Sequence, residues 1–295
     1  MNFITHLIRI LKYGTSYAIA TGFFPKSVAK KVLLLYSFVR IPDNIVDEVV
    51  WIDLLSHYQQ ARVKLLALQD ERIHAYTTNN KEDTVWGQYV SLFQDNQIPF
   101  QYSLDFFRAM IDDCSVHRYE TYEQLECYMY GSASVVGLMM CHLIGFTDPA
   151  HEETAKAYAT ELGNAMQLTN FLRDVREDYE DLGRIYIPTD ILQDHGLSHE
   201  DIISFCHWGY ATAESKKARA DTMQVFIARC RAMYAHSLDG LQYLRPEWRK
   251  AVRLAALLYA SILDKIEKNH YDVFSKSCRT SLWDKVKVLY SFYLV

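Results

Sequence analysis

The sequence predicts an all-α protein that folds as a single domain. Only 11 glycines and 6 prolines interrupt its 295 residues, and it contains no series of short alternating strands bounded by turn residues. Half of the residues are hydrophobic, which is ample for a sizeable core. Because no linker or low-complexity segment divides the chain, we expect residues 1–295 to form one bundle of packed helices.

Helical periodicity and the stop signals between periodic stretches place the helices along the chain. At the N-terminus, apolar residues at helical spacing predict a docked helix over Met1–Tyr13. The helices expected after it span residues 25–50, 51–70, 80–95, 99–113, 121–145, 148–180, 208–237, 246–272 and 281–294. A polar loop is expected at Thr77–Asp83, and the longest irregular segment, in the position of a lid, at Gly183–His199.

The composition argues against several classes of function. A formal net charge of -5 is unlike a polyanion binder, so no nucleic-acid partner is expected. The 6 cysteines are scattered without C-x-x-C spacing and indicate reduced thiols of a cytoplasmic protein, with neither disulfides nor structural zinc. The longest apolar stretch, Val135–Phe146, is shorter than the about 20 residues that cross a bilayer, so no transmembrane anchor is expected.

Two acidic pairs carry the chemistry that the sequence suggests. Asp43 and Asp47 are four residues apart, as are Asp174 and Asp178, and residues at this spacing lie one above the other on a helix. Two such pairs facing each other across a cavity could hold several Mg2+ ions, which could bind a diphosphate leaving group. Pro42 implies either a kinked helix or a new helix that starts there, and both keep the first pair one turn apart.

The second pair belongs to a longer polar stripe. Gln167, Asn170, Asp174 and Asp178 follow one another in steps of three, four and four residues, so two amides and two carboxylates share one helical face. An isolated pair of aspartates at this spacing is usually a solvated acidic face. The two amides on the same stripe favour a site for metal or diphosphate instead.

The surroundings of these pairs resemble the squalene/phytoene synthase family over nearly the whole chain. The matching segments are LYSFVRIPDNIVDE at 35–48, LECYMYG at 125–131, NFLRDVRED at 170–178, GRIYIP at 183–188, YASILDKIE at 259–267 and YDVF at 271–274. The resemblance implies one all-helical isoprenoid-synthase domain with a central active-site cavity. It implies two aspartate-rich helices that bind Mg2+, with Mn2+ as an alternative ion, and diphosphate.

The resemblance also implies roles for individual residues. The carboxylates implied as catalytic metal ligands are Asp43, Asp47, Asp174 and Asp178. Positions that match further metal, diphosphate or substrate contacts are Gln167, Asn170, Arg40, Tyr259, Lys276, Ser16, Tyr17 and Tyr128. Lys276 stands where the family often has arginine, and Arg279 is expected to compensate for the lost bidentate contact. Arg173 and Arg184 either touch phosphate or neutralise the acidic run beside them.

Two further positions depart from the family pattern. Asn44 stands where many relatives carry an aspartate, which removes one charge beside the first pair. Ser134 replaces a glycine that is usual in the helix lining the hydrocarbon tunnel, which weakens any inference about chain length.

The activity implied is a head-to-head (1'-1) condensation of two prenyl diphosphates through a cyclopropylcarbinyl diphosphate. The end of the chain is most similar to bacterial phytoene synthases, which join two geranylgeranyl diphosphates in carotenoid biosynthesis. Squalene, dehydrosqualene or hydroxysqualene formation from two farnesyl diphosphates is the alternative. NADPH is not favoured, since no Gly-rich dinucleotide fingerprint is present.

Two readings from other classes stay open. A terpene cyclase fits because Asn170, Asp174 and Asp178 also match the spacing of a metal triad. A catalytically silent helical scaffold is the non-enzyme alternative. No obligate protein partner is evident, and peripheral membrane contact through the N-terminal helix is the hypothesis for release of an apolar product.

Overall fold

The structure, a computed structural model, describes residues 15–48, 53–82, 84–208, 212–275 and 278–294, without the side chain of Trp208. The helices in this part of the chain are α2 (Thr15–Thr21), α3 (Lys26–Asp47), α4 (Leu54–Thr77), α5 (Val85–Asp95), α6 (Phe100–Asp112), α7 (Tyr122–Met129), the π-helical η1 (Tyr130–Ser134), α8 (Val135–Ile144), the short η2 (Pro149–His151), α9 (Glu152–Arg173), α10 (Val175–Leu182), α11 (Thr189–Asp194), α12 (His199–Trp208), α13 (Ala213–Asp239), η3 (Gly240–Tyr243), α14 (Pro246–Lys268) and α15 (Leu282–Leu294). The predicted all-α class is confirmed. The helix predicted at Met1–Tyr13 lies outside the described residues.

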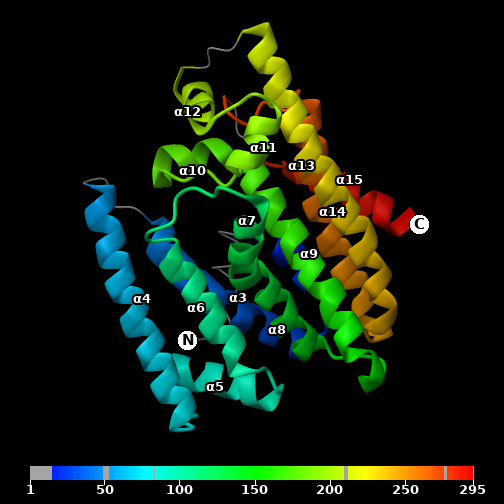
Figure 1. Ribbon diagram of the computed structural model, residues 1–295. Coiled ribbons are helices and arrows are strands. Elements are labelled where there is room, and N and C mark those ends of the chain that lie inside the picture. Colours follow the sequence, from blue (N-terminus) through cyan, green and yellow to red (C-terminus); the bar gives the residue numbers. More distant parts are fainter. Residues whose placement is uncertain (1–14, 49–52, 83, 209–211, 276–277, 295) are drawn as a thin grey trace.

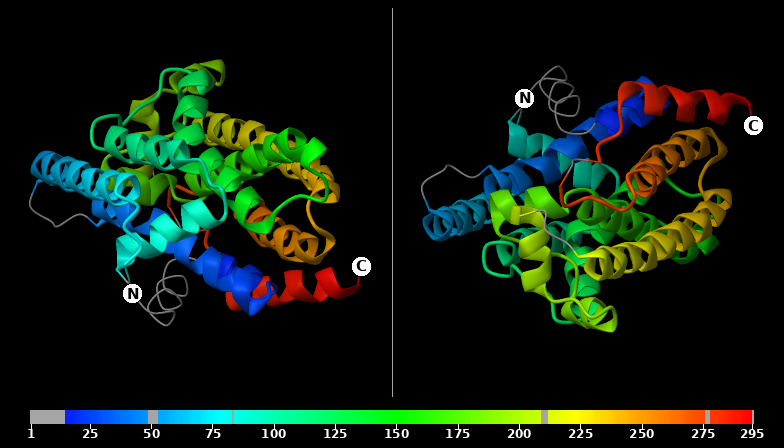
Figure 2. Two further views of the ribbon diagram at one scale, coloured as in Figure 1. Left: turned by 90° about the horizontal axis from the view of Figure 1, so that it is seen from below. Right: turned by 90° about the horizontal axis from the view of Figure 1, so that it is seen from above.

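Helix α9 lies at the centre of the bundle, in contact with α13, α14, η1 and α8. Helices α4, α5 and α6 lie on one side of it, and α13, α14 and α15 on the other (Figure 1). Seen from above and from below, α15 lies beside α2, far from it in sequence (Figure 2). One buried cluster centres on α9, α13 and α14, and a second centres on α3 to α6 and α8. Residues from both sets of helices line a cavity between the two clusters.

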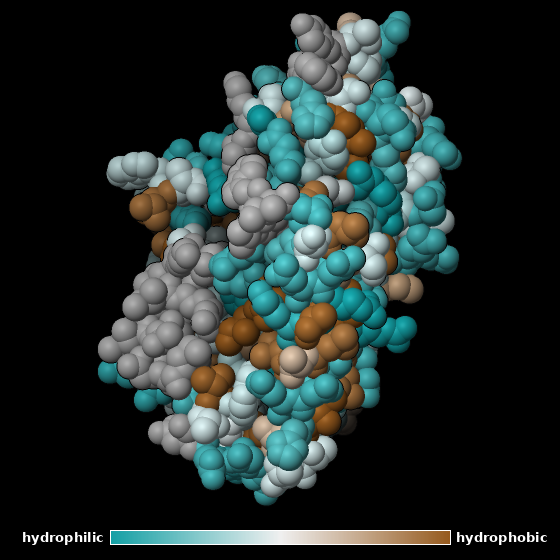
Figure 3. All heavy atoms as spheres, turned by 90° about the vertical axis from the view of Figure 1, so that its left-hand side faces the viewer, coloured by the Kyte–Doolittle hydropathy of each residue, from teal (hydrophilic) through white to brown (hydrophobic). Residues whose placement is uncertain are grey.

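The surface on the α4 side is mixed in character. Hydrophilic residues cover much of this face, with groups of apolar residues between them (Figure 3). Helix α4 itself exposes Leu55 and Val63. Scattered apolar residues are normal on a protein surface, so this face alone indicates no binding function.

Helix α3 runs unbroken through Pro42, so the predicted alternative of a new helix starting there is wrong. Proline has no N–H to offer the carbonyl of Phe38, four residues earlier. Arg72, only 4% exposed, takes that place, because its Nη2 donates to the Phe38 carbonyl oxygen at 3.0 Å. The Arg72 guanidinium also lies 4.0 Å from the Phe38 ring centre and 4.5 Å from that of Phe107, a favourable setting for a buried cation.

The predicted helix over residues 148–180 is interrupted at one residue. Asp174 leaves helical geometry with φ -105° and ψ 13°, which separates α9 from α10. Its N–H still bonds to the Asn170 carbonyl, and the Asp178 N–H bonds to the Asp174 carbonyl at 2.8 Å. The carboxylates of Asp174 and Asp178 therefore remain about one turn apart. Gly183 closes α10 in the left-handed conformation, with φ 65°.

Other boundaries also differ from the prediction. Helix α4 extends to Thr77 rather than residue 70, and α5 begins only at Val85, where Thr84 caps it by accepting from the Gly87 N–H. The segment Gly183–His199 is not irregular throughout, since it contains α11 and ends where α12 begins. Helices α2, α11 and α12 are short, and short helices are stabilised mainly by tertiary packing. Periodicity in the sequence does not reveal such packing. The loop predicted at Thr77–Asp83 agrees with the turn that follows α4 over residues 78–82, whereas Thr77 ends α4 and Asp83 lies outside the described residues.

The run Tyr122–Ile144 comprises α7, η1 and α8, close to the predicted 121–145. It is the one described helical run long and apolar enough to cross a membrane, yet 56% of its most apolar window is buried inside the protein. Burial of this kind is typical of a core helix, which agrees with its packing between α6 and α9.

Gly131 in η1 allows the close approach of α6. A methyl group added at Gly131 would lie 2.8 Å from the Ala109 Cβ and 2.8 Å from the Asp105 carbonyl oxygen. Replacing a helical glycine by alanine usually stabilises a protein by about 1 kcal/mol. At Gly131 the close contact with α6 makes the same replacement destabilising. We expect Gly131→Ala to destabilise the protein by about 1–3 kcal/mol in urea unfolding.

The matched control for Gly131→Ala is Ala235→Ser, which adds one atom at an exposed helical position. It is expected to destabilise the protein by only about 0.5 kcal/mol, the difference in helix propensity between serine and alanine. An unchanged or raised midpoint for Gly131→Ala would show that the approach of η1 to α6 is not close.

Candidate active site

An elongated cavity of about 350 Å³ lies between α2, α3, η1, α8, α9 and α14. Its lining on α9 runs from Ala155 to Arg173, about 27 Å at the helical rise of about 1.5 Å per residue. Most of the lining is aliphatic or aromatic. The charged and amide side chains of the lining gather at one end, beside Tyr259, and they are Arg40, Asp43, Gln167, Asn170 and Arg173. The arrangement suits a molecule with a charged head and a long apolar tail.

The first acidic pair lies on the last turns of α3. Asp43 lines the cavity and forms an ion pair with Arg40, one turn before it. Asp47 points to a buried arginine, with its Oδ1 3.4 Å from the Arg184 Nη1. Burial raises the pKa of Asp47 to about 8; the nearby Asp43 adds to this rise and Arg184 opposes it. The Asp47 side chain is still 32% exposed, and a partly buried carboxylate of this kind is stabilised by any cation that binds beside it.

The second acidic pair faces the first. Asp174 accepts a hydrogen bond at 2.7 Å from the Nε of Arg173 and forms an ion pair with the same guanidinium. Burial, followed by the charges of Asp174 and Asp47, raises the pKa of Asp178 well above its usual value. Arg184 lies between the two pairs, because its Nη1 is 3.4 Å from the Asp47 Oδ1. The backbone also joins them, since the Arg184 N–H donates to the Asp178 carbonyl at 2.9 Å.

Both predicted amides lie at the polar end of the cavity. The Nδ2 of Asn170 donates to the Oε1 of Gln167 at 3.4 Å. The Oδ1 of Asn170 is buried and has no hydrogen-bond partner. An orphaned carbonyl oxygen beside carboxylates indicates a place for a cation.

The donor set at this end fits a hard divalent cation. Carboxylate and amide oxygens are the ligands that Mg2+ prefers in proteins, and Asn170, with its unpartnered oxygen, lines the cavity together with Asp43. Within the described ranges, however, no three Asp, Glu, His or Cys side chains form a ready-made metal site. Arg40 and Arg173 occupy two of the carboxylates instead.

The remaining predicted residues are placed unequally. Tyr17, Tyr128 and Tyr259 all line the cavity, and the rings of Tyr17 and Tyr259 meet edge to face at 5.3 Å. Ser16 precedes Tyr17 on α2 but is not part of the cavity lining. Arg279 pairs with Glu177 at the surface, with 67% of its side chain exposed, and so lies away from the cavity. Lys276 lies outside the described residues.

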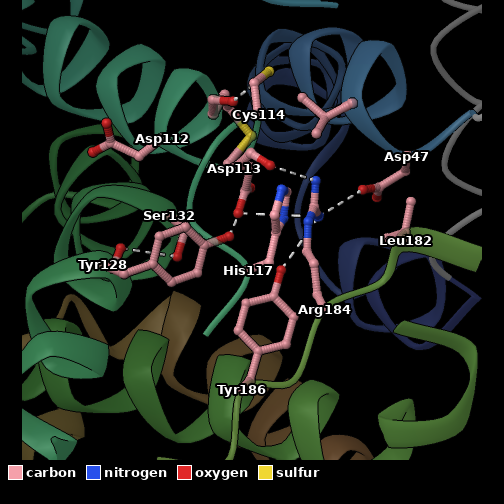
Figure 4. Close-up of polar contacts among 12 residues, drawn as sticks. Asp47, Asp112, Asp113, Cys114, His117, Tyr128, Ser132, Leu182, Arg184 and Tyr186 are labelled. Carbon is pink, nitrogen blue, oxygen red and sulfur yellow. Dashed lines mark hydrogen bonds and ion pairs between the residues drawn. The ribbon is translucent and has the colours of Figure 1, made fainter. Parts of the chain in front are cut away.

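A buried network behind the first pair was not predicted. Arg184, 2% exposed, lies between Asp47, Tyr186 and Asp113 (Figure 4). Its Nη2 donates to the Asp113 backbone carbonyl at 3.1 Å, and its Nη1 to the Tyr186 hydroxyl at 3.3 Å. Arg184 was expected to touch phosphate or to neutralise the run after Asp174; it reaches Asp47 on α3 instead. Asp113 ends α6 without any pattern around it, so no signal in the sequence points to it.

We expect Asp47→Asn to raise the thermal stability of the metal-free protein. The folded protein holds the Asp47 proton more tightly than the unfolded chain does, so between about pH 4 and about pH 8 its stability falls as pH rises. Asparagine removes this penalty and keeps an oxygen for Arg184. The melting temperature of the variant, measured by calorimetry with a chelator present, should exceed that of the wild type at pH 8 and match it near pH 4. A lower melting temperature at pH 8 would contradict this account of the buried carboxylate.

Comparisons with known proteins agree with this geometry. The family model described as squalene/phytoene synthase matches residues 10–284. A phytoene synthase from Arthrospira platensis is 28% identical over 291 residues, covering 94% of this chain and 88% of the relative. A phytoene synthase from Thermus thermophilus is 30% identical, covering 96% and 90%.

Solved structures point the same way. A dehydrosqualene synthase in complex with a ligand superimposes with a TM-score of 0.80 at 25% identity, covering 99% of this chain and 95% of that one. Because the family model spans nearly the whole sequence, the chain belongs to the squalene/phytoene synthase family.

Proposed function

We propose that the protein is a Mg2+-dependent prenyltransferase that joins two geranylgeranyl diphosphates head to head to give phytoene. The observation that carries the proposal is a long apolar cavity whose polar end holds Asp43 and the unpartnered Asn170 carbonyl, with Asp174 paired to the lining residue Arg173. The relatives from Arthrospira platensis and Thermus thermophilus, both named phytoene synthase, support the choice of substrate.

The polar end would bind the diphosphate and its metal ions. The carboxylates of Asp43, Asp47, Asp174 and Asp178, with the Asn170 oxygen, would hold the ions. Bound Mg2+ would supply positive charge against the charge that develops on the leaving diphosphate. Arg40 and Arg173 are paired with Asp43 and Asp174 before substrate binds, and their guanidinium groups are suited to diphosphate oxygens once those carboxylates turn to the cation.

The apolar end would protect the cationic intermediates. Ionisation of the first diphosphate leaves an allylic cation, which the double bond of the second substrate attacks. The lining keeps water away from these cations. Tyr17, Tyr36 and Tyr259 present aromatic rings to the cavity, and each cation–π contact is worth on the order of 1 kcal/mol.

The same site also fits a product from two farnesyl diphosphates. The likeness to the solved dehydrosqualene synthase favours this second candidate. Both candidates share the two acidic pairs, and they differ in how much of the apolar cavity the substrates fill. A cytoplasmic location, and contact with a membrane surface when the apolar product leaves, are further parts of the proposal.

Product analysis tests the proposed function. The purified protein is incubated with geranylgeranyl diphosphate or with farnesyl diphosphate, each with and without Mg2+ and NADPH. We expect a Mg2+-dependent C40 hydrocarbon from geranylgeranyl diphosphate without NADPH. A C30 product would move the assignment to the second candidate, and a cyclic product from one substrate to a terpene cyclase. Absence of product and of diphosphate release from both substrates would favour a binding scaffold.

The acidic pairs are tested by substitution. Asp47→Asn and Asp174→Asn are each expected to lower turnover by about 100-fold or more, because a neutral amide holds a divalent cation poorly. Circular dichroism should show the fold of the wild type. Asp70→Asn, which changes an exposed aspartate on α4, is the matched control and should keep full activity. Turnover like that of the wild type in both site variants would refute the metal assignment.

A further inference from the structure

Tyr128 is held in place by aromatic rings at the wall of the cavity. Its ring centre lies 5.7 Å from that of Tyr119, 5.8 Å from that of Tyr186 and 6.1 Å from that of Phe171. The last two rings stack on each other at 3.9 Å, so the cluster is tightly packed. Packing of this kind fixes the plane of the Tyr128 ring and the position of its hydroxyl oxygen.

The hydroxyl of Tyr128 has a buried partner behind the cavity wall. Its Oη donates to the Oδ2 of Asp113 at 2.8 Å, and the side chain of Asp113 is only 4% exposed. Asp113 is not part of the cavity lining. Asp112, its neighbour in sequence, points elsewhere (Figure 4) and is exposed.

Arg184 holds the Asp113 carboxylate in position. The other carboxylate oxygen, Oδ1, lies 4.0 Å from the Arg184 Nη1 and has no hydrogen-bond partner. The Arg184 Nη2 is fixed by its bond to the Asp113 backbone carbonyl. The carboxylate therefore has a cation on one oxygen and the Tyr128 hydroxyl on the other, and it can only accept.

The protonation states agree with this direction of the hydrogen bond. Burial raises the pKa of Asp113 to about 6, against the opposing effects of Arg184 and the Tyr128 hydroxyl, so the group is ionised at slightly alkaline pH. Burial raises the pKa of Tyr128 well above its usual value. The phenol thus stays protonated and donates a hydrogen bond to an ionised carboxylate.

We propose that Asp113 is a positioning residue that turns the lone pairs of the Tyr128 oxygen toward the cavity. The inference rests on the proposed function, because the direction matters only where a carbocation forms. A phenol oxygen whose proton is hydrogen-bonded to another acceptor presents its lone pairs to a nearby cation and attracts it. A hydroxyl proton that points at the cation repels it. Asp113 acts through Tyr128 and does not touch the substrate.

Asp113→Asn tests the inference with little change in size. The amide nitrogen is repelled by the Arg184 guanidinium, so it turns to Tyr128 and donates to the phenol oxygen. The Tyr128 proton is then left to face the cavity. With the prenyl diphosphate that the wild type converts, we expect kcat to fall about 100-fold and KM to change by less than about threefold. Asp112→Asn is the matched control and should keep the wild-type kcat.

A double-mutant cycle separates this role from a structural one. Tyr128→Phe should lower kcat to a similar extent, and adding Asp113→Asn to it should cause no further loss, because both changes remove one effect. A structural role for Asp113 would lower kcat by the same factor in both backgrounds. That additive result, or a wild-type kcat in Asp113→Asn, would overturn the inference.

Asp113→Glu provides a second route if the asparagine variant does not fold. Glutamate keeps an acceptor for the Tyr128 proton, so it should retain more of kcat than asparagine or, where asparagine does not fold, more than Tyr128→Phe. A glutamate variant that folds and is no more active than these would overturn the inference. Failure of the proposed function is distinguishable, because then the wild type itself forms no hydrocarbon from either substrate.

Discussion

The structure depends on gathering carboxylates near one end of an apolar cavity: Asp43 lines it, Asp174 pairs with the lining residue Arg173, and Asp47 pairs with Arg184 behind it. Partly buried carboxylates repel one another and lose hydration, and the pKa of Asp47 and that of Asp178 rise accordingly. Three arginines offset this cost within the protein. Arg40 and Arg173 pair with an aspartate of their own helix region, and Arg184 reaches Asp47 from the loop after α10. The site is therefore held together by arginine–aspartate ion pairs. A bound cation could replace the arginine at each aspartate, and a diphosphate could replace the aspartate at each arginine.

The helices that carry the site are shaped by the same requirement. Arg72 supplies the donor that Pro42 lacks, which keeps α3 continuous up to Asp47. The irregular geometry at Asp174 divides α9 from α10, yet the helical hydrogen bonds continue past it. Behind the first pair, Arg184 joins Asp47 to Asp113, and Asp113 accepts from Tyr128. The aspartates proposed to hold the metal and the cavity wall are thus parts of one network.

The sequence predicted the all-α fold, because helical periodicity is local. Spacing along single helices also led to Asp43, Gln167 and Asn170, which line the cavity; their role as ligands stays a prediction. Spacing carries no information about partners that meet only in the folded chain, so Asp113 and Arg72 were not found. The expected role of Arg279 beside Lys276 remains a prediction, and the structure pairs Arg279 with Glu177 at the surface.

Titration calorimetry of Mg2+, with and without inorganic diphosphate, tests the central claim most directly. The arginine pairs at Asp43 and Asp174 should make Mg2+ bind weakly alone, and diphosphate should raise its affinity by about tenfold or more, because it draws the guanidinium groups away. By linkage, Mg2+ should raise the affinity for diphosphate by the same factor. Tight binding of Mg2+ alone, unchanged by diphosphate, would contradict the account.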